Sequence, residues 1–297
     1  YPGDRLLVGE IDDIAYYGDG SKELHMVFNF PLMRTDRITP SWIRKNQQER
    51  LSALPPTAWP CNTLNNHDAP RMFSRYGDGK HNNEIARLNL ALMLTLKGTP
   101  FLYNGEEIGM SDLMLDDINQ FRDNLGVWIY GELTNSTEIP VETALDIVQK
   151  VTRDKCRTPM QWNNAPNAGF CPEGVESWLP VNPNYAKGTN ITDQINDSGS
   201  MLNFYKQLLA IRKSNPALVE GDYLALHDDQ DAYFAFLRTL HESSCLVVLN
   251  YSQEPQSIPL NLDAADYKMV FSNVERTESI VLEKLIVAPF EILIIDL

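Results

Sequence analysis

The sequence predicts an α/β protein in which parallel strands alternate with helices, followed by a small antiparallel β domain. Two observations predict this organisation. Short apolar runs alternate with longer segments of helical pattern over the first hundred residues, which is typical of βαβ units. After Asp222 the pattern changes to short strand-like runs separated by turn residues. The chain has 297 residues, which is enough for one large domain or two.

The predicted parallel strands are four short apolar runs, at residues 5–10, 25–30, 61–64 and 99–103. Each run is followed by polar or acidic side chains, which are Glu10, Asn29, His67 with Asp68, and Glu106 with Glu107. The carboxyl ends of parallel strands meet at one face of a (β/α) barrel, and ligands also bind at strand ends in an open doubly wound sheet. We therefore expect these side chains to share one face, whichever of the two architectures applies.

Helices are predicted between the strands at residues 40–54 and 84–97, the second ending at Gly98, and again at residues 201–211. Between them, residues 111–195 are rich in Asn and Pro and weakly periodic, so we expect an irregular excursion of the kind that often carries function. Strands of the C-terminal domain are predicted at residues 233–237, 245–251, 268–271, 280–282 and 290–295.

The composition argues against several classes of protein. Lys and Arg number 25 against 40 Asp and Glu, a net charge of −15, which repels nucleic-acid phosphates. No apolar run approaches the ~18 residues of a membrane-spanning helix. The spacing of the four cysteines does not match that of zinc ligands. The favoured interpretation is that they are reduced thiols, although Cys156 and Cys171 are close enough in sequence to form a disulfide. The compartment stays open, with the cytoplasm favoured over secretion.

Two carboxylates at neighbouring strand ends, Glu10 and Asp68, suit acid/base work on a polyhydroxy substrate. The local sequence leaves simpler readings open: Glu10 as a surface loop glutamate, and His67 with Asp68 as a turn that caps a strand end. The acidic loop at Asp112, Asp116 and Asp117 does not match an EF-hand, and a solvated face is the favoured reading. Nucleophile-elbow and HExxH motifs are absent from the sequence.

Several motifs resemble the alpha-amylase family of retaining glycoside hydrolases, and within it the alpha-glucosidase and oligo-1,6-glucosidase branch. They are LVGE at 7–10, LNNHDAPR at 64–71, GTPFLYNGEEIGM at 98–110 and RDKCRTPMQW at 153–162, supported by YYG at 16–18, ELH at 23–25 and NF at 29–30. They follow the family's order and span nearly the whole chain, and RTPMQW at 157–162 is highly specific.

The resemblance implies a role for each matching residue. Glu10 matches the general acid/base, and Asp68 matches the carboxylate that holds sugar hydroxyls and stabilises the transition state. His67 matches a histidine that hydrogen-bonds the same glucose, and Arg153 matches an arginine that lines the glucose subsite. Residues 157–162 are expected mainly to shape the loop that carries Arg153.

The resemblance also implies a fold, namely the second half of a (β/α)8 TIM barrel over residues 1–218, followed by an antiparallel β-sandwich over residues 219–297. A retaining enzyme needs a nucleophilic carboxylate about 5–5.5 Å from the acid. In this family that carboxylate lies on the fourth barrel strand, and the chain starts at what resembles the fifth. We therefore expect the C-terminal portion of a larger glucosidase, poorly folded and catalytically silent when expressed alone.

The expected function is hydrolysis of terminal alpha-linked glucose from short oligosaccharides, with retention of configuration. The alternatives are a trehalose synthase-like transglycosidase and a non-catalytic, glucosidase-like ancillary or sugar-binding protein. Hydrolysis of this kind requires carboxylates and water and no organic cofactor. Calcium occurs in the family, but the sequence does not identify its ligands.

Overall fold

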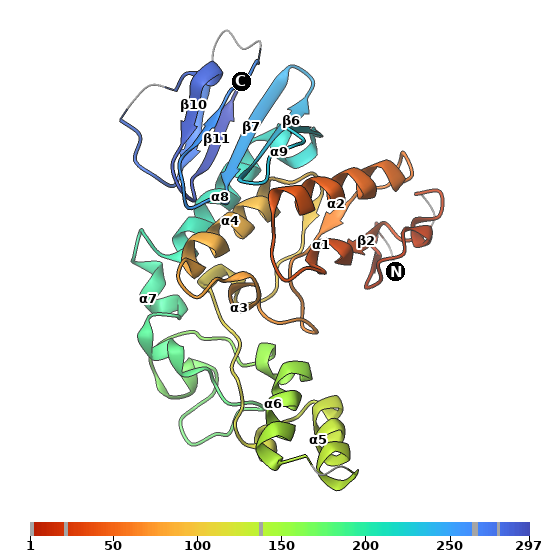
Figure 1. Cartoon of the computed structure of the whole chain (residues 1–297), viewed down its shortest axis with the longest axis vertical. Coiled ribbons are helices and arrows are strands. Elements are labelled where there is room, and N and C mark those ends of the chain that lie inside the picture. Colours follow the sequence, from red (N-terminus) through yellow and green to blue (C-terminus); the bar gives the residue numbers. More distant parts are fainter. Residues whose placement is uncertain (1–2, 21–22, 137–138, 263–266, 278–279) are drawn as a thin grey trace. The chain divides into compact units, whose positions relative to one another are not determined.

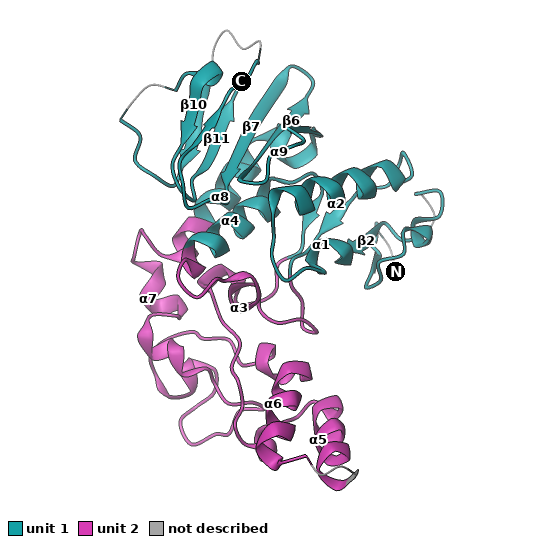
Figure 2. Ribbon diagram, in the orientation of Figure 1, with its two compact units in different colours: residues 1–64, 84–101, 206–297 teal, residues 65–83, 102–205 magenta. Residues whose placement is uncertain are grey.

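The computed structural model describes residues 3–20, 23–136, 139–262, 267–277 and 280–297, and it divides into two compact units (Figures 1 and 2). Unit 1 contains residues 1–64, 84–101 and 206–297, and unit 2 contains residues 65–83 and 102–205. Each unit is described by itself. Among the described helices, none combines the length and apolar character needed to cross a membrane.

Unit 1 contains a parallel sheet of the order β1-β2-β3-β4. Its strands are β1 (Val8–Gly9), β2 (Met26–Asn29), β3 (Cys61–Asn62) and β4 (Thr99–Pro100), and every neighbouring pair runs parallel. The predicted strands are thus confirmed, although each is shorter than its apolar run. Glu10 directly follows β1 and Asn29 ends β2, as expected for polar groups at the carboxyl ends of strands.

Helix α2 (Pro40–Ala53) covers β2 and β3 through polar contacts, after the short helix α1 (Phe30–Met33). Thr39 caps its first turn by accepting a hydrogen bond from the backbone of Trp42, and Pro40 occupies the first helical position. The buried amide of Asn29 donates to Asn46 of α2 over 2.8 Å and to Asn62 of β3 over 3.0 Å. This amide chain satisfies polar groups that burial would otherwise leave without partners.

Helix α4 (Asn82–Thr95) connects β3 to β4 and is the most completely buried helix segment of unit 1. Every residue from Leu88 to Thr95 is buried, so this helix supplies much of the apolar contact to the sheet. Gly98 follows the helix with φ +118°, and a Cβ there would lie 2.6 Å from the backbone oxygen of Pro60. Only glycine fits this connection.

An antiparallel region completes unit 1 and follows α9 (Pro216–Glu220). One sheet has the order β5-β6-β7-β11-β9, with β5 (Asp222–Leu226), β6 (Tyr233–Leu240), β7 (Ser243–Asn250), β9 (Lys268–Ser272) and β11 (Ile292–Asp296). A two-stranded sheet pairs β8 (Gln256–Ile258) with β10 (Leu285–Val287). Both sheets contribute to one apolar core that includes Leu246, Ile258, Val287 and Leu293.

The prediction of a strand at residues 280–282 is wrong. The backbone there turns into the 3-10 helix η7 (Leu282–Lys284), and the strand is β10, which starts at Leu285. The apolar side chains of Ile280, Leu282 and Leu285 are all buried in the same core. Burial of these side chains is therefore consistent with the pattern, but the pattern does not distinguish a strand from a tight helical turn.

Unit 2 is largely helical and irregular. Its α-helices are α3 (Met72–Tyr76), α5 (Asn124–Ser136), α6 (Val141–Val151) and α7 (Ile191–Ile195), and α8 (Met201–Ser214) begins in unit 2 and continues into unit 1. Unit 2 also contains the short 3-10 helices η2 (Glu106–Ile108), η3 (Ile118–Gln120), η4 (Asp154–Cys156), η5 (Pro166–Gly169) and η6 (Pro183–Lys187), whereas η1 (Ile14–Tyr17) belongs to unit 1. The expectation that residues 111–195 form an irregular excursion is wrong for α5, α6 and α7, which lie within this range.

Helices α5 and α6 were not predicted from the sequence. The apolar residues of α5 are spread around the helix, whereas those of α6, at Val141, Ala144, Leu145 and Val148, do follow a helical spacing that was overlooked. Helix α5 carries two glycines and leaves Leu125, Val127 and Trp128 exposed. Val148 of α6 packs with Phe121 and other apolar residues in a small core of unit 2. Burial of the apolar face of α6 in this core stabilises the pair.

Candidate functional site

Asp68 and His67 lie in the loop that opens unit 2 after β3. The side chain of Asn65 accepts a hydrogen bond from the backbone of Asn66 over 2.7 Å, and the side chain of Asn66 accepts one from the backbone of Asp68 over 2.9 Å. These bonds to backbone N–H groups determine the turn. His67 Nε2 lies 3.4 Å from Asp68 Oδ1.

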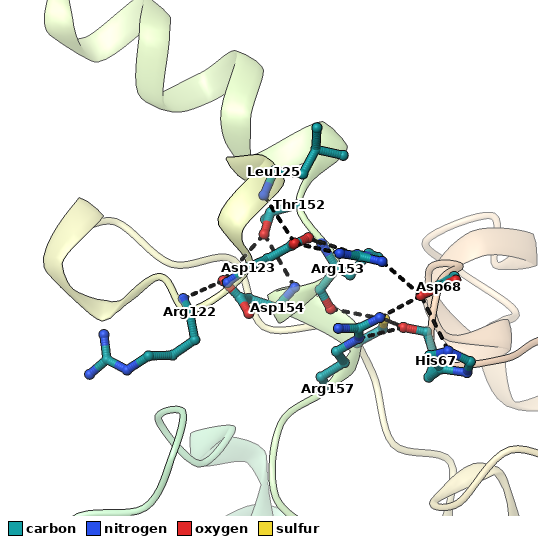
Figure 3. Close-up of polar contacts among 10 residues, drawn as sticks. His67, Asp68, Arg122, Asp123, Leu125, Thr152, Arg153, Asp154 and Arg157 are labelled. Atoms are coloured by element: carbon teal, nitrogen blue, oxygen red, sulfur yellow. Dashed lines mark hydrogen bonds and ion pairs between the residues drawn. The ribbon is translucent and has the colours of Figure 1, made fainter. Parts of the chain in front are cut away.

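Two guanidinium groups also reach the Asp68 carboxylate (Figure 3). Arg153 Nη1 lies 3.4 Å from Asp68 Oδ1, and Arg157 donates to the same oxygen from Nη2. Arg157 Nε in addition donates to the backbone oxygen of His67 over 2.7 Å. All these side-chain contacts fall on Oδ1, so they orient the carboxylate and surround it with positive charge.

Arg153 is held by Asp123, 30 residues earlier in the chain. Its Nε donates to Asp123 Oδ2 over 2.9 Å and its Nη2 to Oδ1 over 2.7 Å, a two-pronged pair, while its backbone N–H donates to Oδ2 as well. The Asp123 side chain is fully buried. The Arg153 hydrogen bonds hold the pKa of Asp123 well below its usual range, and the same pairing raises the pKa of Arg153.

Asp154 holds the backbone next to the Asp123–Arg153 pair in place. It is buried, and its Oδ2 accepts hydrogen bonds from the backbone of Arg122 over 2.7 Å and of Asp123 over 2.9 Å (Figure 3). Because Asp154 is the neighbour of Arg153, it ties the two chain segments of the pair together. Asp123 and Asp154 were not among the predicted site residues, and the local sequence around Asp123 contains no signal for such a role.

The loop at residues 157–162 does more than shape its surroundings. Arg157 contacts Asp68 directly, so its expected role was too narrow. Gln161 has the structural role expected of it, because it is buried and its side chain donates to Asn184 and to the backbone of Thr189.

Cys156 and Cys171 are both free, and Cys156 lies buried with its thiol 3.0 Å from the Arg153 backbone oxygen. Burial raises the pKa of the Cys156 thiol to about 11.

Two buried ionisable side chains, Arg71 and Glu106, belong to unit 2 as well. Arg71 is 2% exposed, and its guanidinium donates to the backbone oxygen of Asn104 over 2.8 Å and lies over the Tyr103 ring. Glu106 is buried too, and burial raises its pKa to about 8. Arg71 and Glu106 are thus buried inside unit 2, and the Arg71 guanidinium connects the segment after Asp68 to the segment at Asn104.

The predicted solvated face at Asp112, Asp116 and Asp117 is only partly correct. Asp116 and Asp117 are exposed. Asp112 is half-buried and accepts a hydrogen bond from the backbone of Arg71 over 2.8 Å, and burial raises its pKa. Within the residues that the structure describes, these three side chains do not come together as metal ligands.

The predicted site residues His67, Asp68 and Arg153 lie together in unit 2. Glu10 belongs to unit 1, where it is exposed at the end of β1 and next to the buried Gly9. In this cluster of unit 2, two guanidinium groups and an imidazole contact one carboxylate and orient it. Such a group suits binding of hydroxyls and stabilisation of positive charge.

The catalytic-domain model of the family "Alpha amylase, catalytic domain" matches residues 2–221. The chain is 31% identical to an oligo-1,6-glucosidase of Bacillus cereus, over 99% of this chain and 55% of that protein. It is 34% identical to a glucan 1,6-alpha-glucosidase of Streptococcus pneumoniae, over 99% of this chain and 57% of that protein. The chain thus spans about half the length of these relatives.

Solved structures give the same picture. The isomaltulose synthase from Erwinia rhapontici NX5 matches with a TM-score of 0.83 and 31% identity, over 98% of this chain and 55% of that one. A trehalulose synthase matches with a TM-score of 0.85 and 28% identity, over 99% of this chain and 56% of that one. The similarity therefore covers both the parallel and the antiparallel parts of the chain.

Proposed function

Because the chain belongs to the alpha-amylase family, in its alpha-glucosidase branch, we propose that the protein is an alpha-glucosidase. It would release glucose from the non-reducing end of short alpha-linked oligosaccharides with retention of configuration. The observation that carries the proposal is the Asp68 carboxylate, which two arginines and His67 contact at one oxygen. Oligo-1,6-glucosidase and glucan 1,6-alpha-glucosidase relatives support this substrate class.

In the proposed mechanism the Asp68 carboxylate lies beside Arg153 and Arg157. It accepts hydrogen bonds from sugar hydroxyls and stabilises the positive charge that develops on the ring in the transition state. His67 donates to the same glucose, and Arg153 lines its subsite. Asp123 acts through Arg153, because it determines the orientation of the guanidinium.

Glu10 is the proposed general acid/base. It would protonate the glycosidic oxygen and later accept a proton from the attacking water. Its place at the end of β1 supports this role, because catalytic groups of such sheets lie at the carboxyl ends of strands. The nucleophilic carboxylate is expected from a segment that these 297 residues do not contain.

The proposed architecture follows from the same membership. Strands β1 to β4 would be the last four strands of a (β/α)8 barrel, in a domain that ends at residue 218, with the antiparallel region as a separate domain from residue 219. The four parallel strands in sequential order and the family match to residues 2–221 support this division. The reaction uses carboxylates and water, so we propose no cofactor. We propose the cytoplasm as compartment, which the four free cysteines support.

The test is the hydrolysis of isomaltose and maltose by the complete polypeptide that the gene encodes, followed by NMR of the anomeric proton. We expect alpha-glucose as the first product. Glu10→Gln and Asp68→Asn should each lower kcat by about 10²–10⁴-fold, because one removes the acid and the other a charge-stabilising group. Asp116→Asn, at an exposed carboxylate, is the matched control and should retain activity. Release of beta-glucose, or full activity in either variant, would contradict the proposal.

A second candidate is glucosyl transfer within sucrose, which the structural similarity to isomaltulose and trehalulose synthases favours. Chromatography of the products from sucrose separates the two functions. Free glucose and fructose indicate hydrolysis, whereas an isomeric disaccharide as the main product indicates transfer. Binding of sugar without turnover by the complete polypeptide would instead support an ancillary protein.

A further inference from the structure

Trp178 of unit 2 presents an exposed ring that is held in one orientation. Its indole N–H donates to the backbone oxygen of Arg157 over 2.9 Å. Its ring packs edge-to-face against Phe170, with centroids 4.7 Å apart and an interplanar angle of 82°. The side chain is nevertheless 55% exposed. With its polar atom bonded and the Phe170 contact in place, the ring still offers much of its apolar surface to solvent.

The loop that carries Trp178 is closed by its own hydrogen bonds. The side-chain amide of Asn167 donates to the backbone oxygens of Pro172 over 3.1 Å and Val175 over 2.9 Å. Ser177 donates to the backbone oxygen of Leu179. A loop bonded in this way loses little further conformational entropy when a ligand contacts it, so the ring is preorganised for binding.

Arg157 connects this ring to the carboxylate of the candidate site. Its backbone oxygen accepts from Trp178, while its guanidinium donates to the backbone of His67 and to the carboxylate of Asp68. Trp178 and Asp68 therefore contact one and the same residue at its two ends. The indole is thus separated from the Asp68 carboxylate by the length of one arginine residue.

Exposure alone does not distinguish Trp178, since single exposed hydrophobic residues are common on proteins. Trp128 on α5 is 62% exposed and lies in the same unit. What distinguishes Trp178 is the combination of a bonded indole N–H, a ring packed against Phe170 and attachment to Arg157. Trp128 therefore serves as the matched control.

We propose that Trp178 is a stacking platform for the sugar on the leaving-group side of the scissile bond, and so a specificity-determining residue. This inference rests on the proposed function. A pyranose ring carries patches of C–H groups, which are apolar and slightly positive, and the face of an aromatic ring is apolar and negative. Stacking therefore favours substrates with a second sugar ring over glucosides that have only a small alkyl group there.

The experiment compares isomaltose with methyl alpha-glucoside, which has no second sugar, using the complete polypeptide. The quantity is the ratio of kcat/KM for the two substrates. Trp178→Ala should lower this ratio about five- to tenfold, because the KM for isomaltose rises when the stacking contact is lost. Trp178→Phe keeps an aromatic face and should retain most of the ratio, and Trp128→Ala should leave both substrates at the wild-type level.

An unchanged ratio in Trp178→Ala overturns the inference. An equal loss for both substrates overturns it as well, because it assigns Trp178 only to the support of Arg157. Calorimetric measurement of isomaltose and glucose binding distinguishes a failure of the stacking inference from a failure of the proposed function. If the wild type does not hydrolyse isomaltose but binds it more tightly than glucose, and Trp178→Ala loses that advantage, the stacking role stands without hydrolysis. If Trp178→Ala keeps the advantage, the role is excluded.

Discussion

Two buried carboxylates of unit 2 respond to their surroundings in opposite directions. Asp123 accepts three hydrogen bonds from Arg153, which hold its pKa well below the usual range. Glu106 has no guanidinium bonded to it among the described contacts, and burial raises its pKa to about 8. At pH 7 one carboxylate is therefore charged and the other mostly neutral. The local partner decides the charge of a buried acid more than burial itself.

Asp123→Asn should lower the free energy of unfolding by about 2 kcal/mol at pH 7, because charged hydrogen bonds to Arg153 are lost. The contribution of Asp123 is fully present above its unfolded pKa of about 4 and is lost as pH falls toward the depressed native pKa. Urea denaturation should thus show a difference from wild type that is largest at pH 7 and shrinks below about pH 4. A difference that is equal at pH 7 and pH 3 would exclude this explanation.

Glu106→Gln should have the opposite pH dependence. A carboxyl group whose native pKa is raised above its unfolded value of about 4.3 favours the folded state fully below that value, and this contribution is lost as pH rises through about 8. The neutral amide does not titrate. The variant should therefore gain stability relative to wild type between about pH 4 and pH 8. Thermal unfolding across this range measures the gain, and parallel curves for the two proteins would contradict it.

At the scale of elements, one buried arginine of β6 joins two helices to the antiparallel sheet. Arg238 is fully buried, and it donates to the backbone oxygens of Thr95 at the end of α4, Leu218 of α9 and Gly221. The last carbonyl groups of a helix have no partner inside the helix. Arg238 satisfies such groups, and burial lowers its pKa to about 9.

Arg238→Met should lower the free energy of unfolding by about 3 kcal/mol, because the buried carbonyl oxygens lose their donor while the apolar stem is kept. Chemical denaturation at neutral pH measures this loss. Arg37→Met, at an exposed arginine of the same unit, should change stability by less than about 0.5 kcal/mol. A similar effect in both variants would mean that the hydrogen bonds of Arg238 contribute nothing specific.

At the scale of the whole molecule, the parallel sheet is open. β1 and β4 stand at the two ends of its order, and each pairs with a single neighbour among the described strands. Unpaired strand edges present backbone N–H and C=O groups that associate with other chains. Leu6 and Leu7, just before β1, are 62% and 53% exposed, which adds apolar surface at one of these edges.

The 297-residue chain expressed by itself should therefore self-associate and show no alpha-glucosidase turnover. Size-exclusion chromatography with light scattering at micromolar concentration tests the first expectation, and the release of glucose from isomaltose tests the second. A monodisperse monomer with robust turnover that Glu10→Gln abolishes would contradict both. The comparison is the complete polypeptide under identical conditions.

Much of this protein was predictable from patterns within short segments. The parallel strands, most of the antiparallel strands and the helices at α2, α4 and α8 follow from the period of apolar residues, because that period reports which face of an element is buried. The family follows from motifs that are local too, such as RDKCRTPMQW. Helix α5 was not predictable in this way, since its apolar residues are spread around the helix, whereas the apolar stripe of α6 was present in the sequence and was overlooked.

The sequence by itself determined the alternation of strands and helices, the polar residues at the strand ends and the grouping of His67, Asp68 and Arg153 as candidates. Only the tertiary structure decided that Asp123 holds Arg153, that Arg157 reaches Asp68, and that Trp178 is attached to Arg157. The physical reason is separation along the chain. Pairs 21 to 89 residues apart meet through the packing of whole segments, and no local period records such a meeting.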